Sequence, residues 1–97
     1  MNEIKRLWIE FAARPFPPEL TGAEEIDGIN LVSLDTFAAG CIDTFLERNA
    51  CLDAQRTLVL DQCVRELAII ERKLTGDAKA YFVELRILSE KVLRSLG

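Results

Sequence analysis

Residues 53–97, DAQRTLVLDQCVRELAIIERKLTGDAKAYFVELRILSEKVLRSLG, decide the fold of this chain. Apolar residues recur there at every third or fourth position, which is the spacing of one face of an α-helix. The pattern predicts helices over residues 53–75 and 77–95, with Asp53 as the N-cap of the first. Because only Gly76 separates the two ranges, we expect the helices to pair as an antiparallel hairpin.

The ends of these two helices carry recognisable signals. Gly76 supplies the left-handed residue that ends the first helix, and Asp77 is expected to cap the second. The stripe predicted to face the core consists of Leu60, Cys63, Val64, Leu67, Ile70, Leu74, Ala78, Tyr81, Phe82, Leu85, Leu88, Val92 and Leu96.

Two more helices are predicted upstream. One spans residues 35–48, with Ser33 or Asp35 as its N-cap, since a short side-chain oxygen can accept from the first free amides of a helix. Its predicted apolar face consists of Leu34, Phe37, Ala38, Cys41, Ile42 and Phe45. A shorter helix is expected over residues 3–13, and the prolines within residues 14–18 must end it. The apolar residues at helical spacing in this shorter helix are Ile4, Leu7, Trp8, Phe11 and Ala12.

Residues 14–33 are expected to form an ordered loop that contains the prolines. Its local signal is Asp27 followed by Gly28, a pair that favours a tight turn. The flanking residues Glu25 and Asn30 are poor strand formers, so a loop is predicted there in preference to a hairpin.

The whole chain is predicted to be one domain, residues 1–97, because its length is typical of a single hydrophobic core. We expect an all-α fold, a small helical bundle of three main helices within residues 34–97 plus the short N-terminal helix.

The segment 27–35, DGINLVSLD, and the Ala-Gly-Cys that follows at 39–41 resemble a family of small uncharacterised bacterial helical proteins. The resemblance extends over residues 27–97. It implies a bacterial, single-domain helical protein and assigns no functional residue, because the family has no assigned activity.

The charge is unevenly distributed. Twelve Lys and Arg against sixteen Asp and Glu give a net charge of −4, which argues against a nucleic-acid binder. Between residues 19 and 53 the chain has one base, Arg48, and these acids: Glu19, Glu24, Glu25, Asp27, Asp35, Asp43, Glu47 and Asp53. Such a region either attracts a basic partner or is a solvated surface that maintains solubility.

The cysteines indicate a reducing compartment. Cys41, Cys51 and Cys63 are odd in number and follow no disulfide spacing. Cys41 and Cys63 are expected to be buried and Cys51 to be exposed. No apolar run approaches the length of a membrane span, so we expect a cytoplasmic protein that binds no membrane.

Most catalytic chemistries lack their residues. The chain has no histidine, which removes Ser-His-Asp and Cys-His nucleophile systems and the usual zinc sites. Asp43 and Glu47 share one helix face, but two outward acids are more often solvated than metal-bound. We therefore expect no cofactor and assign no catalytic or metal-binding residue.

Four apolar residues fall on the outer faces of the last two helices: Leu58, Ile69, Val83 and Ile87. Paired exposed apolar residues suggest a covered surface. The cover is the first helix, a second copy or another protein, and a symmetric dimer is the arrangement that we expect.

Two classes of function remain. The first is a non-enzymatic protein–protein interaction or regulatory module, of which an acidic antitoxin or immunity-like protein is the most concrete form. The alternative is a carboxylate- and metal-dependent enzyme or enzyme subunit.

Overall fold

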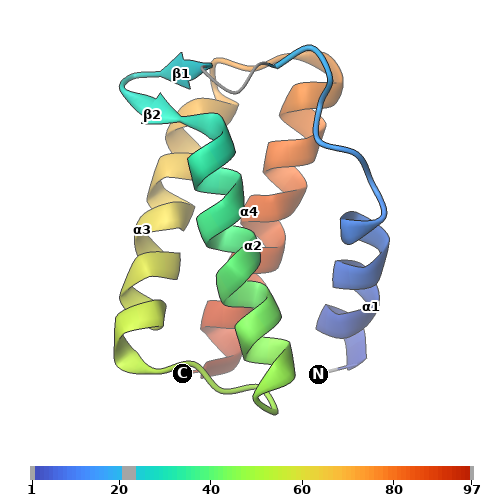
Figure 1. The fold of residues 1–97 in the computed structure, drawn as a ribbon, viewed down its shortest axis with the longest axis vertical. Coiled ribbons are helices and arrows are strands. Elements are labelled where there is room, and N and C mark those ends of the chain that lie inside the picture. The colour runs from blue at the N-terminus through green and yellow to red at the C-terminus, as the bar shows by residue number, and fades with distance from the viewer. Residues whose placement is uncertain (1, 21–23, 97) are drawn as a thin grey trace.

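The computed structural model describes residues 2–20 and 24–96 and confirms the all-α fold. Its elements are α1 (Asn2–Ala12), β1 (Glu25–Ile26), β2 (Ile29–Asn30), α2 (Leu31–Glu47), α3 (Ala54–Glu71) and α4 (Gly76–Leu96). As predicted, the fold consists of three long helices and one short N-terminal helix (Figure 1).

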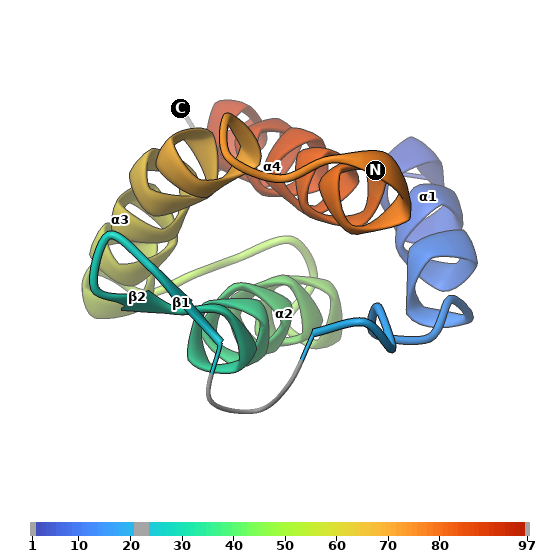
Figure 2. The same ribbon diagram turned by 90° about the horizontal axis from the view of Figure 1, so that it is seen from above.

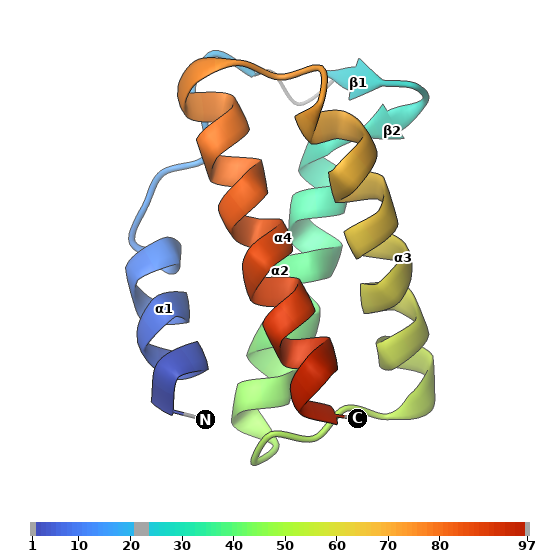
Figure 3. The ribbon, with the colours of Figure 1, turned by 180° about the vertical axis from the view of Figure 1, so that it is seen from behind.

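The three long helices form a triangle when they are seen along the bundle (Figure 2). α3 packs against both α2 and α4, and α1 packs against α4 on the side away from α3. The view from behind shows α4 between α1 and α3 (Figure 3). α1 therefore covers the side of the bundle next to α4 and away from α3, and no other helix of the described chain covers the α2–α3 side or the α3–α4 side.

The segment before α2 differs from the predicted loop. β1 and β2 pair antiparallel, with Ile26 opposite Ile29. The turn residues Asp27 and Gly28 both have positive φ, 53° and 78°, as a type I′ hairpin requires. The prediction of a loop was therefore wrong for residues 25–30. The hairpin has only two residue pairs, so the turn decides whether it forms, and the low strand propensity of Glu25 and Asn30 has little effect.

α2 begins earlier than predicted. The side chain of Asn30 accepts a hydrogen bond from the Ser33 amide at 2.8 Å, which makes Asn30 the N-cap. Neither Ser33 nor Asp35 is the cap, because the hairpin already ends at Asn30 and the helix follows directly. The sequence signal was present, since asparagine is among the strongest N-cap residues.

The caps of the last two helices are partly as predicted. The Asp53 carboxylate accepts from the Arg56 amide at 2.8 Å, which confirms Asp53 as N-cap, and Gly76 has φ of 62°, as its predicted left-handed role requires. However, α3 ends at Glu71, before the predicted residue 75, and Gly76 is the first residue of α4, so it is not the residue that ends α3. Asp77 lies inside the first turn of α4 and so does not precede the helix as a cap.

The core contains nearly all of the predicted stripes, but two residues were wrongly placed. Phe37 and Ala12 are exposed, although both are spaced as apolar-face residues. Ser89 is fully buried and donates its hydroxyl hydrogen bond to the Leu85 carbonyl at 2.8 Å, which satisfies the polar group inside the helix itself.

One ion pair lies at the edge of the core between α3 and α4. Arg86 Nε donates to Glu71 Oε2 at 2.8 Å, and both side chains are more than three-quarters buried. Glu71, at the border of the α3 core stripe, therefore has a partner on α4.

Candidate interaction surface

The candidate surface lies in the groove between α2 and α3. A cavity of about 300 Å³ opens there, and Phe37, Gly40 and Thr44 of α2 face Val59 of α3 across it. The remaining lining residues are Thr36, Cys41 and Arg56. The floor therefore consists of small side chains, with larger apolar ones at the edges.

Phe37 is the largest side chain at this groove, and 59% of it is exposed. One helical turn separates it from the buried Leu34 and from the buried Cys41, which places it at the border of the apolar face of α2 rather than at its centre. Val59 is exposed to 39% on the facing helix. An exposed aromatic ring opposite an exposed valine marks an apolar surface that the chain itself leaves open.

Gly40 leaves an empty space beside Phe37. A methyl group built at Gly40 would meet no heavy atom within 4 Å, apart from its own helical backbone and chain neighbours. Its φ does not require glycine, since only Gly28 and Gly76 among the described glycines have positive φ. A glycine inside a helix costs about 1 kcal/mol relative to alanine. Nothing in the described fold requires this one, and its effect is to keep the groove hollow.

None of the four predicted interface residues lines this cavity. Leu58 and Ile69, on the outer side of α3, are exposed to 71% and 43%. Ile87 lies on the other side of the bundle, in a cavity of about 250 Å³ that it shares with Leu7 of α1, and Val83 is only half-buried. No described cavity brings all four together. The sequence pattern identified outward-facing residues, but it could not place α1 beside Ile87.

Half of the eight acids of the middle region, its four aspartates, have partners within the chain. Trp8 Nε1 donates to Asp43 at 2.8 Å. Lys73 Nζ lies 2.8 Å from Asp27. Asp53 pairs with Arg56 Nη1 at 2.5 Å. Asp35 accepts a hydrogen bond from the Tyr81 hydroxyl at 2.7 Å. These four carboxylates are therefore already engaged in contacts within the chain.

Asp35, the partner of Tyr81, has its carboxyl partly removed from solvent. Burial raises the pKa of the Asp35 carboxyl above its ordinary value, and the Tyr81 hydrogen bond partly opposes that rise. Burial likewise raises the pKa of the Tyr81 phenol, and the hydrogen bond to Asp35 adds to the effect. The pair lies beside a cavity of about 250 Å³ lined by Tyr81, Arg14, Asp77, Glu19 and three prolines. Its hydrogen bond joins α2 to α4, which is a structural role.

The cysteines lie where the sequence predicted. Cys41 and Cys63 are buried and Cys51 is exposed. Burial raises the pKa of the Cys41 thiol and raises the pKa of the Cys63 thiol to about 12. A thiol with a raised pKa is a poor nucleophile at neutral pH. Cys41 therefore lines the groove as a small apolar residue rather than as a reactive group.

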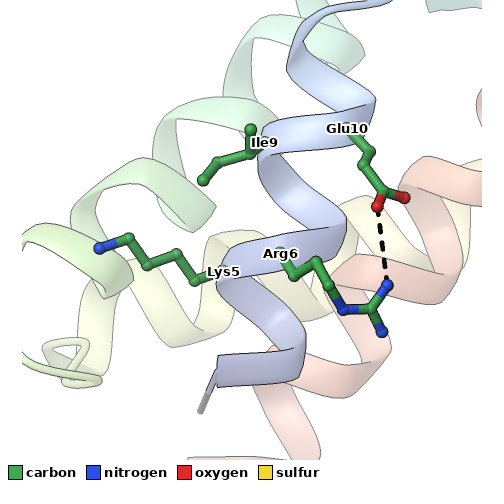
Figure 4. Close-up of a pocket in the computed structure, with 4 residues that line it drawn as sticks. All are labelled: Lys5, Arg6, Ile9 and Glu10. Carbon is green, nitrogen blue, oxygen red and sulfur yellow. Dashed lines mark ion pairs between the residues drawn. The ribbon is translucent and has the colours of Figure 1, made fainter.

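A further shallow cavity lies on α1 (Figure 4). Lys5 and Ile9 extend to one side of the helix, and Arg6 and Glu10 extend to the other and form an ion pair of 3.6 Å. Ile9 is exposed to 59%, the same fraction as Phe37. Charged residues surround this isoleucine, and all four lining residues come from one helix, so it offers a partner a single apolar side chain rather than a groove.

The described residues contain no candidate metal site and no candidate membrane-spanning helix. Within residues 2–20 and 24–96, no group of three or more cysteine, aspartate or glutamate side chains is arranged to hold a metal ion. None of the helices in these same ranges is long and apolar enough to cross a membrane. Comparison with known proteins found no matching family model, no similar curated protein and no similar solved structure.

Proposed function

We propose that this protein is a protein–protein interaction module that binds its partner through the α2–α3 face. We define this face as Phe37, Gly40, Leu58, Val59 and Ile69. The observation that carries the proposal is the exposed Phe37 ring beside the open cavity at Gly40. Aromatic residues that enter pockets are typical of the energetic centres of interfaces.

The chemistry of the face favours an apolar contact over an electrostatic one. The described lining of the cavity has no carboxylate, and its single base, Arg56, is already paired with Asp53. The four aspartates of the acidic region also have partners inside the chain. Support for an antitoxin-like role, which rests on attraction of a basic partner, is therefore weaker than support for association through apolar side chains.

Photo-crosslinking tests the proposal in the cells that make the protein. A photoreactive phenylalanine analogue is placed at position 37 and, in a second variant, at position 9. The two positions are matched because Phe37 and Ile9 are equally exposed and both lie on helices. We expect a discrete crosslinked species from position 37 and none from position 9.

Any single dominant adduct at position 37, whether with another protein or with a second copy, supports the interaction module. If position 37 yields no adduct, or the same diffuse products as position 9, the proposal is wrong.

A further inference from the structure

We infer that the occupant of the α2–α3 face is a second copy of this chain, bound in a two-fold symmetric dimer in which each Phe37 enters the cavity beside Gly40 of the other copy. This inference rests on the proposed interaction function and names the partner.

The first argument is that one helix carries both a protrusion and the space that receives it. Phe37 projects from α2, and the space at Gly40 lies one turn further along the same helix. The cavity at Gly40 measures about 300 Å³ and is open to solvent, so a ring from another chain can enter it from outside.

The second argument is symmetry. In a two-fold interface, residue i of one copy contacts residue j of the other, and j contacts i in return. Two antiparallel copies of α2 place Phe37 against Gly40 twice at once, because the two positions are only about 4.5 Å apart along the helix axis. An unrelated partner would have to supply its own protruding group and its own receiving space. This chain already has both.

The third argument is charge. The chain has a net charge of −4, so two copies repel each other at long range. The cavity itself does not add to that repulsion, because its described lining contains no acid and the Arg56 guanidinium lies 2.5 Å from Asp53. A ring that enters the cavity therefore covers no unpaired charge there, which would be the costly case.

The fourth argument is area. A stable interface covers about 800 Å² on each partner, and the described chain exposes 5754 Å². The dimer therefore needs about one seventh of the surface. α2 and α3 are two of the four helices in the described residues, and the exposed Leu58 and Ile69 also lie on α3.

The test uses the purified full chain and two variants that alter opposite halves of the contact. Phe37→Ala removes the protruding ring, and Gly40→Leu fills the receiving space. Both variants should fold: Phe37 is exposed, and a methyl group at Gly40 meets nothing in the monomer and improves the helix. Circular dichroism and melting temperature check this before association is measured.

Sedimentation velocity over the micromolar range should show that wild type dimerises and that the Kd of each variant alone is raised by about tenfold or more. Mixing the two variants should restore a heterodimer. Phe37, retained in the Gly40→Leu chain, enters the open space at Gly40, retained in the Phe37→Ala chain. At the second contact the shortened side chain at position 37 meets the enlarged one at position 40, so the two changes compensate.

A matched control separates this contact from general surface effects. Ile9→Glu changes a residue that is as exposed as Phe37 but lies on α1. This variant should leave the Kd of the dimer unchanged.

Three results would overturn the inference: a wild type that stays monomeric up to about 100 µM, well above the Kd range of specific complexes; a dimer that both variants leave intact; or a mixture that fails to associate. A monomeric wild type together with a crosslink from position 37 to a different protein would overturn the second copy and leave the interaction function standing. A monomer without any crosslink would overturn both.

Discussion

Two sides of this bundle, α1–α4 and α2–α3, differ in what the chain does with its aromatic residues. On the α1–α4 side, Phe11 and Phe16 pack against Tyr81, with ring centroids 4.7 and 5.6 Å apart. On the α2–α3 side, Phe37 faces solvent beside an empty space. The comparison teaches that α1 completes the hydrophobic core on one side, whereas on the other side apolar side chains stay exposed in the described chain.

Polar contacts strengthen the same difference. Three pairs join the α1 segment to the rest of the bundle: Trp8 with Asp43, Lys91 with Glu3, and Arg14 with Glu84. In the α2–α3 groove the described polar contact across the helices is the Cys41 thiol, which donates weakly to the Arg56 carbonyl at 3.7 Å. Polar pairs therefore link the α1 segment to the rest of the bundle, whereas only this weak contact is described across the α2–α3 groove.

The largest effect expected from this comparison separates two phenylalanines. Phe11 is buried to all but 3% of its surface and Phe37 is exposed to 59%. Phe11→Ala should lower the free energy of unfolding by about 3–5 kcal/mol, because it leaves a cavity beside Tyr81. Phe37→Ala should change it by no more than about 0.5 kcal/mol in the monomer, because little packing is lost. Urea unfolding at low protein concentration measures both.

Equal losses from the two phenylalanine variants would break the comparison. A large loss at Phe37 would mean that this ring packs inside the monomer. A small loss at Phe11 would mean that α1 contributes little to the core.

A smaller effect is expected from the hydrogen bond that joins α2 to α4. Tyr81→Phe leaves the half-buried Asp35 carboxylate without its 2.7 Å donor. The loss should be about 1–3 kcal/mol in the free energy of unfolding, the cost of an unsatisfied buried polar group. The control is the same change in an Asp35→Ala background, where most of the loss should disappear. An undiminished loss there would assign the effect to packing of the ring instead.

Asp35 also predicts a dependence on pH. Burial holds the pKa of this carboxyl above its ordinary value of 3.8 in the folded chain, so the folded state keeps the proton to higher pH than the unfolded state does. Raising the pH through this window therefore lowers stability. Asp35→Asn cannot titrate and retains an oxygen that accepts from Tyr81. The free energy of unfolding of wild type minus that of the variant should fall as the pH rises through and above the ordinary pKa of 3.8. A rise would contradict the burial of the carboxyl.

The fold was largely predictable because its signals are local. Helical spacing identified all four helices of the described residues, and the left-handed conformation of Gly76 and the cap at Asp53 were read from single residues whose chemistry allows few alternatives. The hairpin at Asp27 was missed because two residue pairs give no alternating pattern to detect. The early start of α2 was missed with it, since the Asn30 cap is meaningful only once the hairpin is known.

None of the residues that line the α2–α3 cavity was predicted as an interface residue, and the reason is tertiary. Spacing along one helix shows that Leu58 faces away from its own core stripe, but it does not show which neighbour lies beside an outward residue. Ile87 is outward on α4 and still meets Leu7, because α1 folds back there. Phe37 is spaced as a core residue of α2 and is nevertheless exposed, because α3 approaches on the side of Cys41 and leaves the ring at the edge of the groove.

The smallest expected effect tests this division of the predicted interface residues. Ile87→Ala should lower the free energy of unfolding by about 1 kcal/mol, since part of its side chain lies against the α1–α4 cavity with Leu7. Leu58→Ala should stay within about 0.5 kcal/mol at low concentration, because 71% of this leucine is exposed. Alanine is used at both sites because it is the best helix former and adds no loss of helix propensity.

Repeating urea unfolding at high protein concentration sharpens the result. A dimer that forms through the α2–α3 face adds stability that grows with concentration, so the loss at Leu58 should increase there while the loss at Ile87 stays constant. The opposite pattern, a concentration-dependent loss at Ile87 alone, would place the interface on the α1–α4 side.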